Sequence, residues 1–291
     1  MIGRWIEAMR LRTLPVSVAG VIAGTACAVM CGGFSVVPAV LCLLFAVLAQ
    51  IASNFGNEYY DFKNGLDKKG REGFRRGVTE GDISPAAMKR ATYLTLAVAA
   101  VVGLAMLAFG EWWLVIVGAL IGVFALAYSA GPYPLSHHGL GDVAVVVFFG
   151  VVPVTFTCYL QMLDWGALPH SLPTAVATGL VAANVLIVNN YRDADDDVSV
   201  GKRTTVVIFG RKAMGWCYLA SGLLAMLLMI PVWVELGACS LFVPVLYSVM
   251  HVATWKKVVH SRGAALNPLL GRSAVNLLLF ALLLLVAAIL L

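Results

Sequence analysis

Long apolar segments, separated by short breaks, follow one another along the whole chain. A helix that crosses a bilayer needs about 20 mostly apolar residues. Windows of that length occur at 13–31, 36–56, 90–109, 111–130, 141–161, 171–191, 213–234, 237–255 and 271–291. The breaks between them hold Gly, Pro or charged residues, as at Gly32-Gly33 and Gly131-Pro132. The pattern therefore predicts an all-α, polytopic membrane protein with nine transmembrane helices.

The composition agrees with a lipid environment. The 291 residues are 61% hydrophobic and only 12% charged, whereas a soluble globular protein has about 25% charged residues. Such a chain has too little polar surface to cover a water-soluble body. Because the apolar segments are spread evenly, we expect one membrane domain, residues 1–291, rather than two soluble ones.

The basic residues lie on one side of this predicted bundle. With nine spans and a cytoplasmic N-terminus, all 20 Lys and Arg fall in the cytoplasmic segments or at their edges; these segments are 1–12, 57–89, 131–140, 192–212 and 256–270. The loops of the opposite side contain Glu111, Asp164 and Glu235 but no Lys or Arg. An excess of basic residues marks the cytoplasmic side. The same arrangement places 12 of the 15 acids there, which the positive-inside rule does not explain.

Two polar clusters contain most of the candidate chemistry. In the first, Asn57 and Asp61 are four residues apart and share one face of a continuing helix, and Asp67 follows after Gly65. The second ends the sixth span with Asn189, Asp193 and Asp197 at four-residue spacing, followed by Gly201-Lys202-Arg203-Thr204. Both clusters contain the pattern Asn-x-x-x-Asp, on the same side of the membrane.

Carboxylate and amide oxygens are hard ligands that suit Mg²⁺. Acids at helical spacing repel one another, so a bound cation would stabilise each cluster. A diphosphate bridged by metal ions and neutralised further by Lys and Arg is a good leaving group. A single cluster could be a solvated helix end, but two matching clusters favour a shared site of diphosphate chemistry.

Asp142 lies near the cytoplasmic end of the fifth span and has two interpretations. An acid inside a membrane segment is a functional candidate, and an acid in the first turn of a helix is also stabilised by the helix dipole. His137 and His138 occupy the preceding loop, where we expect them to be solvated.

Over nearly its whole length the chain resembles the UbiA superfamily of membrane prenyltransferases. The segments that carry the resemblance are Arg10-Leu-Arg12-Thr-Leu-Pro15, Asn57-Glu-Tyr-Tyr-Asp61-Phe-Lys63-Asn-Gly65-Leu-Asp67, Tyr128-Ser129-Ala-Gly131-Pro132, Gly139-Leu-Gly141-Asp142, Asn189-Asn190-Tyr-Arg192-Asp193 with Asp197, Gly201-Lys202-Arg203-Thr204, and Leu266-Asn267-Pro268-Leu269-Leu270. Many members have Asn-x-x-x-Asp-x-x-x-Asp in the first cluster, whereas here the last acid is Asp67. This longer spacing resembles the branch that prenylates 1,4-dihydroxy-2-naphthoate in bacterial menaquinone synthesis.

The resemblance implies a nine-helix bundle in the bacterial inner (cytoplasmic) membrane, with a central cavity and a Mg²⁺-dependent transfer of a polyprenyl group from its diphosphate to an aromatic acceptor, which loses CO₂. It implies the following roles: Asn57, Asp61 and Asp67 for one metal ion; Asn189, Asp193 and Asp197 for the other; Lys63, Arg76, Tyr128, Ser129, Lys202 and Arg203 for the diphosphate; Arg10 and Asp142 for the acceptor; and Asp61, Asp193 and Lys202 as the catalytic residues. It implies no nucleic acid and no obligate protein partner.

Two alternatives stay open at this stage. The same fold could act on another acceptor, such as 4-hydroxybenzoate, homogentisate, a glyceryl phosphate ether lipid or haem. A cation-coupled transporter would also contain membrane acids, but it should place them near the midplane with access from both sides. Here the acids gather on one side, which favours the enzyme.

Overall fold

The computed structural model describes residues 2–70 and 73–291. These residues form helices joined by loops, and an isolated bridge pairs His138 with Arg203. The main helices are α1 (Ile2–Met9), α2 (Leu14–Met30), α3 (Val36–Lys63), α4 (Pro85–Ala105), α5 (Leu114–Ala127), α6 (Gly141–Val145), α7 (Val152–Met162), α8 (Leu168–Ser199), α9 (Thr205–Leu228), α10 (Ile230–Leu236), α11 (Phe242–His260) and α12 (Asn267–Ile289). The prediction of an all-α membrane protein is confirmed.

The predicted number of spans is not confirmed. In the described residues, seven helices are long and apolar enough to cross a membrane, or eight if α9 and α10, which meet at a bend of 46°, form one span. The remaining candidate, predicted at 111–130, is α5, whose 14 residues are fewer than the roughly 20 that a bilayer requires. Glu111 and the exposed Trp112, which lie inside the predicted window, precede the start of α5.

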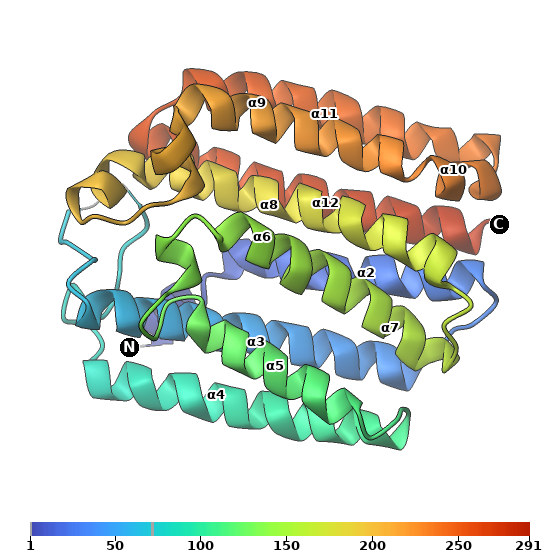
Figure 1. Cartoon of the computed structure of the whole chain (residues 1–291), viewed down its shortest axis with the longest axis horizontal. Coiled ribbons are helices and arrows are strands. Elements are labelled where there is room, and N and C mark those ends of the chain that lie inside the picture. Colours follow the sequence, from blue (N-terminus) through green and yellow to red (C-terminus); the bar gives the residue numbers. More distant parts are fainter. Residues whose placement is uncertain (1, 71–72) are drawn as a thin grey trace.

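The long helices lie side by side, and the polar connections gather at one end of the bundle (Figure 1). The connections after α3, between α5 and α6, after α8 and between α11 and α12 all lie at the end where the chain starts, and the C-terminus lies at the other (Figure 1). We call this end the polar end. The predicted gathering of the basic and acidic segments on one side of the bundle is thus present in the fold.

Two helices continue beyond their apolar spans. The apolar windows end at 56 and 191, but α3 continues to Lys63 and α8 to Ser199. One turn or more of each helix therefore projects past the apolar part of the bundle. Since side chains four residues apart share a helix face, these extensions present the two Asn-x-x-x-Asp patterns as ordered stripes.

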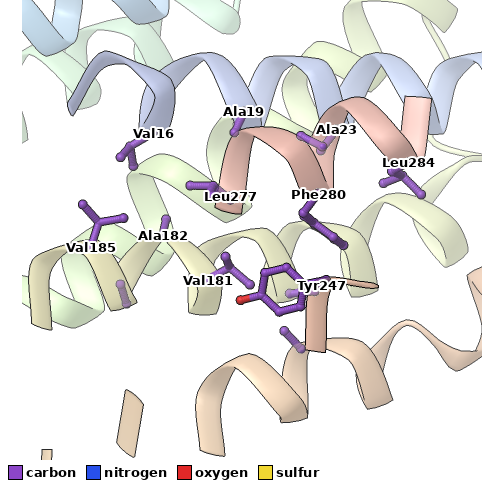
Figure 2. Close-up of a cluster of buried hydrophobic side chains, with 14 of the residues drawn as sticks. Val16, Ala19, Ala23, Val181, Ala182, Val185, Tyr247, Leu277, Phe280 and Leu284 are labelled. Carbon is purple, nitrogen blue, oxygen red and sulfur yellow. The ribbon is translucent and has the colours of Figure 1, made fainter. Parts of the chain in front are cut away.

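The core lies where α2, α8, α11 and α12 meet. Figure 2 shows small side chains of α2 and α8, such as Ala19 and Ala182, opposite the larger Leu277 and Phe280 of α12, with Tyr247 of α11 beside them. Small residues allow helix axes to approach closely, which favours packing between membrane helices. This core holds α8, and with it the second cluster, in a fixed position.

Two glycines allow a close approach between α8 and the helical segment before α7. A Cβ added to Gly150 would lie 2.4 Å from Ala175 O and 2.4 Å from Gly179 Cα, both backbone atoms of α8. Gly150 belongs to a π-helical segment, Val146–Val151, that joins α6 to α7. This π-helical segment, a rare feature inside α-helices, therefore lies directly against α8.

Replacing Gly150 by Val should lower the free energy of unfolding by about 1–3 kcal/mol, because the new side chain must push α7 away from the backbone of α8. The measurement is the thermal unfolding midpoint of the purified protein in detergent. Gly118→Val is the matched control, since a Cβ at Gly118 has nothing within 4 Å. Equal midpoints for the two variants would contradict the close packing of α7 on α8.

Candidate active site

The end of α3 presents a buried polar group. The Asn57 amide donates one hydrogen bond to Asp61 Oδ2 (3.0 Å) and another to Ser129 Oγ (2.9 Å). The Arg10 guanidinium donates to Asn57 Oδ1. Arg10 lies between α1 and α2 in a left-handed backbone conformation, with φ 53°. Three segments distant in sequence, namely α3, the α1–α2 connection and the end of α5, thus meet at Asn57.

Asp67 returns toward α3 through a turn. Asn64 and Gly65 end the helix, with Gly65 at φ 70°, and the Leu66 N–H donates to Asp61 O at 2.9 Å. Glycine adopts this positive φ without steric cost. Asp67 then pairs with Arg76, whose Nε lies 3.5 Å from Asp67 Oδ2. Two candidate site residues, one for a metal and one for the diphosphate, therefore already contact each other.

The end of α8 presents the second stripe. Asn189 Nδ2 lies 3.4 Å from Asp193 Oδ2, and both side chains bind the guanidinium of Arg192. Asp193 and Asp197 are 3% and 6% exposed. These low values show that the stripe faces the protein interior, because a solvated helix end would leave its carboxylates in water.

Lys202 joins the two clusters. Its Nζ lies 3.9 Å from Asp61 Oδ2 and 4.0 Å from Asp197 Oδ1, and its backbone N–H donates to Asp197 O at 2.9 Å. A small cavity of about 20 Å³ lies at this point. Its lining comes from both clusters: Asp61, Leu66, Asp67, Lys68, Asp196, Asp197, Ser199, Val200 and Lys202. The predicted juxtaposition of the clusters is therefore present.

The loop between α5 and α6 closes a third side of the site. His137 Nε2 lies 3.5 Å from Asp61 Oδ1, and His137 O accepts a hydrogen bond from the Arg203 N–H at 3.0 Å. Tyr128 follows α5 directly, where burial and the nearby carboxylates of Asp142 and Asp61 raise the pKa of its phenol. The Tyr128 hydroxyl therefore keeps its proton and can donate a hydrogen bond.

Three candidates lie at the edge of the site. Lys63 and Arg203 have exposed side chains, although the backbone of Arg203 is held by His137. Asp142 accepts a hydrogen bond from Thr205 Oγ1 at 2.5 Å, which ties the start of α6 to the start of α9. Nothing in these contacts assigns Asp142 to an acceptor, so its role stays a prediction.

The carboxylate and amide oxygens of the two clusters are ligands that suit Mg²⁺. Asp61 Oδ1 is buried and makes no regular hydrogen bond within the described residues, with His137 Nε2 at 3.5 Å. A bound cation would stabilise a buried carboxylate oxygen of this kind. The cavity beside it is large enough for one or two ions or water molecules. The described residues nevertheless contain no group of three or more His, Cys, Asp or Glu placed to hold a metal by themselves. Asn57, Asn189 and the diphosphate would complete the ligand sets.

An apolar cavity of about 660 Å³ begins next to the polar site. It lies between α2, α3, α4, α5 and the α6–α7 region, and its lining includes Tyr128 and Ser53, one helical turn before Asn57. The lining continues along α3 to Cys42, a further distance of about 16 Å at the rise of an α-helix. The site therefore combines a charged end with a long apolar chamber.

Two residues near the clusters have no assigned role in the sequence-based prediction. Arg192 was named only as part of a segment that carries the family resemblance, and His137 was expected to be solvated, yet both contact cluster acids. The sequence contained a signal for Arg192, because it follows Asn189 by three residues and therefore lies on the same helix face. No comparable signal existed for His137, since its contact depends on how a loop folds.

Comparison with known proteins identifies close relatives. A model of the UbiA prenyltransferase family matches residues 17–269. The 1,4-dihydroxy-2-naphthoate octaprenyltransferase of Escherichia coli K12 is 40% identical over 212 residues, 71% of this chain and 68% of that protein. The Mycobacterium leprae protein of the same name is 36% identical over 241 residues, covering 80% of each chain.

Solved structures share the fold at low sequence identity. An apo UbiA homologue from Aeropyrum pernix K1 superposes with a TM-score of 0.70 at 15% identity, covering 94% of this chain and 97% of that one. A UbiA homologue from Archaeoglobus fulgidus, bound to GPP and Mg²⁺, gives 0.63 at 18% identity, covering 97% and 100%. These two likenesses show a common architecture.

Proposed function

The chain belongs to the UbiA prenyltransferase family, and we propose that it transfers a polyprenyl group from polyprenyl diphosphate to 1,4-dihydroxy-2-naphthoate. The observation that carries the proposal is the juxtaposition of two acidic clusters, joined by Lys202, with a long apolar chamber. Relatives at 36–40% identity bear the name of this activity. The product is a prenylated naphthoquinol, demethylmenaquinol.

The charged end binds the diphosphate. We assign Asn57, Asp61 and Asp67 to one Mg²⁺ ion and Asn189, Asp193 and Asp197 to another, as the sequence predicts. When bound, Mg²⁺ neutralises the negative charge that develops on the departing diphosphate. Lys202 and Arg76 add positive charge, and Ser129 and Tyr128 can donate hydrogen bonds to the same oxygens. Lys63 and Arg203 stay as candidates at the rim.

The apolar chamber binds the isoprenoid and protects the reaction from water. Cleavage of the allylic C–O bond leaves its electron pair on the diphosphate and a cation on the prenyl carbon. Among the residues that line the chamber, those farther from the charged end than Tyr128 are mostly aliphatic or aromatic, so few polar groups can hold water there. The ring carbon that carries the carboxylate then attacks the cation, and the bond to the carboxylate breaks, so that CO₂ leaves and its electron pair returns to the ring.

The acceptor needs a cationic partner for its carboxylate. Arg10 is the candidate, because its guanidinium lies at Asn57, beside the cluster. Asp142, which accepts a hydrogen bond from Thr205, supports the proposal as a second polar group near Tyr128. We assign both to the acceptor, Arg10 to the carboxylate and Asp142 to a ring hydroxyl.

We further propose that the polar end faces the cytoplasm of a bacterial cell, with the chain acting as one domain in its inner membrane. The connections that contain the basic residues gather at this end (Figure 1). Basic residues are retained on the cytoplasmic side. The short connections at the opposite end of the bundle include the acids Glu111, Asp164 and Glu235.

Filling the chamber should discriminate between long and short prenyl donors. Gly122 lines the chamber, and a Cβ there has nothing within 4 Å, so Gly122→Leu can fold while it occupies space for the isoprenoid. We expect KM for a long-chain polyprenyl diphosphate to rise roughly tenfold or more, and KM for dimethylallyl diphosphate to stay unchanged. Steady-state kinetics with both donors measures this.

Ile116→Phe is the control, because Ile116 lies on the same helix with its side chain 54% exposed and is absent from the chamber lining. It should leave both KM values unchanged. An equal effect of Gly122→Leu on both donors would contradict the assignment of the chamber to the isoprenoid.

Mass spectrometry of the quinones in a deletion strain tests the acceptor. A strain that lacks this gene should lose its prenylated naphthoquinones and accumulate 1,4-dihydroxy-2-naphthoate, and a plasmid copy should restore the quinones. Loss of benzoquinones instead would point to 4-hydroxybenzoate or homogentisate. That result would overturn the proposed acceptor while leaving a prenyl transfer intact.

A further inference from the structure

Arg192 occupies an unusual position for a charged residue. It lies on α8 and is only 4% exposed. Its guanidinium donates to Asp193 Oδ1 from Nε (2.7 Å) and to Asp193 Oδ2 from Nη2 (2.8 Å). Nη2 also donates to Asn189 Oδ1 (2.9 Å), and Nη1 to Asn267 Oδ1 at the start of α12 (3.0 Å). Each of the three guanidinium nitrogens therefore has an oxygen acceptor.

The contacts of Arg192 coincide with a predicted metal ligand set. The proposed function assigns Asn189 and Asp193 to a Mg²⁺ ion, and the side-chain oxygens of both residues already accept hydrogen bonds from Arg192. A guanidinium that binds a carboxylate through two parallel N–H bonds takes up the carboxylate edge that a metal ion would need. Arg192 and a divalent cation therefore compete for Asp193.

Arg192 also has other contacts that could hold it after it leaves Asp193. Asn267 Oδ1 accepts from Nη1, the nitrogen that does not bind Asp193. The ring of Phe74, in the connection between α3 and α4, lies 5.0 Å from the guanidinium carbon, within the range of a cation–π interaction. The guanidinium carbon of Arg12 also lies over the Phe74 ring, 4.6 Å from its centroid.

We propose that Arg192 is a positioning residue that acts as an internal counter-cation for the second cluster. It holds Asn189 and Asp193 in line, and it gives up Asp193 when a divalent cation enters. Removing the guanidinium therefore uncovers the metal ligands and strengthens metal binding. This inference rests on the proposed function, because it takes Asn189 and Asp193 to be metal ligands.

The test is the binding of Mn²⁺ alone to the purified protein in detergent, followed by electron paramagnetic resonance. Gln at position 192 keeps a hydrogen-bond donor but removes the charge. Arg192→Gln should bind Mn²⁺ about tenfold more tightly than the unchanged protein, since charge-assisted hydrogen bonds no longer compete for Asp193. In the presence of EDTA, Arg192→Gln should have a lower thermal unfolding midpoint than the unchanged protein. Mn²⁺ should then raise the midpoint of the variant by more than it raises that of the unchanged protein.

The matched control is Arg211→Gln. Arg211 also binds an aspartate of α8 through two nitrogens, at 3.1 and 2.8 Å, but its partner Asp195 lies on the exposed side. This variant should bind Mn²⁺ as the unchanged protein does. If Arg192→Gln does not fold, Arg192→Lys is the second variant. Lys keeps the charge but cannot bind both carboxylate oxygens of Asp193 through two parallel N–H groups. This variant should therefore also bind Mn²⁺ more tightly than the unchanged protein.

Two results would overturn the proposal. Equal or weaker Mn²⁺ binding by folded Arg192→Gln or Arg192→Lys would make Arg192 a permanent structural partner of Asp193, and the proposed function would stand. Absence of Mn²⁺ binding by the unchanged protein, together with prenyl transfer that continues in EDTA, would remove the metal from the proposed function itself. Prenyl transfer by the unchanged protein, measured with and without Mg²⁺, distinguishes failure of this inference from failure of the proposed function.

Discussion

Asp61→Asn should lower kcat/KM for prenyl transfer by about a thousandfold, equivalent to about 4 kcal/mol of transition-state stabilisation. Asp61 is 2% exposed and lies at the centre of the site, where it meets Asn57, His137 and Lys202. Asn keeps the shape and a hydrogen-bonding oxygen but loses the charge that would bind the metal ion. Steady-state kinetics in detergent, with Mg²⁺ varied, measures the loss. Asp193→Asn should lower kcat/KM to a similar extent.

Asp195→Asn is the control for these two variants. Asp195 is on α8, two residues from Asp193, but its side chain is 87% exposed and pairs with Arg211. It should keep nearly full activity. Full turnover by Asp61→Asn or Asp193→Asn would contradict the assignment of the two clusters to diphosphate chemistry.

Lys202→Gln should lower kcat/KM by about a hundredfold to a thousandfold, the usual effect of removing one donor that stabilises a developing anion. Lys202 is the cation that both clusters share, since its Nζ lies about equally far from Asp61 and Asp197. Its loss removes a charge from the diphosphate and leaves the two acids to repel each other. The measurement is kcat/KM for the prenyl diphosphate.

Lys202→Arg should recover part of this activity, because it restores the charge. Lys212→Gln, on an exposed part of α9, should behave as the unchanged protein. A Lys202→Gln variant with unaltered kinetics would show that the lysine serves only the packing of the loop after α8.

Much of the fold follows from the apolar pattern. The membrane helices begin and end within a few residues of most predicted windows, and their polar connections share one end of the bundle (Figure 1). Length and hydropathy suffice for this, because lipid leaves few alternatives to a helix. The pattern fails where a helix is short, as in α5, or bent, as between α9 and α10.

Two local departures from regular α-helix geometry could not be predicted from the sequence. The π-helical segment Val146–Val151 contains Gly150, which lies against the backbone of α8. Helix α9 is interrupted at Gly210, where φ is 79°. Both features depend on neighbours that are distant in sequence. A glycine in an apolar helix signals only that such a contact is possible.

The sequence predicts which residues form the candidate site, but it does not predict which side chains contact one another there. The four-residue spacing of Asn57 with Asp61, and of Asn189 with Asp193, is enough to align each pair on a helix. The arginines that bind these pairs could not be predicted in the same way. Spacing does not reveal that Arg192 binds both Asn189 and Asp193, or that Arg10 reaches Asn57, because several arginines lie at the same end of the bundle.

The central claim is a prenyl transfer to a naphthoate at this site, and one assay tests it most directly. The purified protein is incubated with a polyprenyl diphosphate, Mg²⁺ and 1,4-dihydroxy-2-naphthoate labelled with ¹³C in its carboxylate. We predict a prenylated naphthoquinol without the label, released ¹³CO₂ in equal amount, and no product in EDTA. No product from the naphthoate, with efficient prenylation of 4-hydroxybenzoate under the same conditions, would contradict the account.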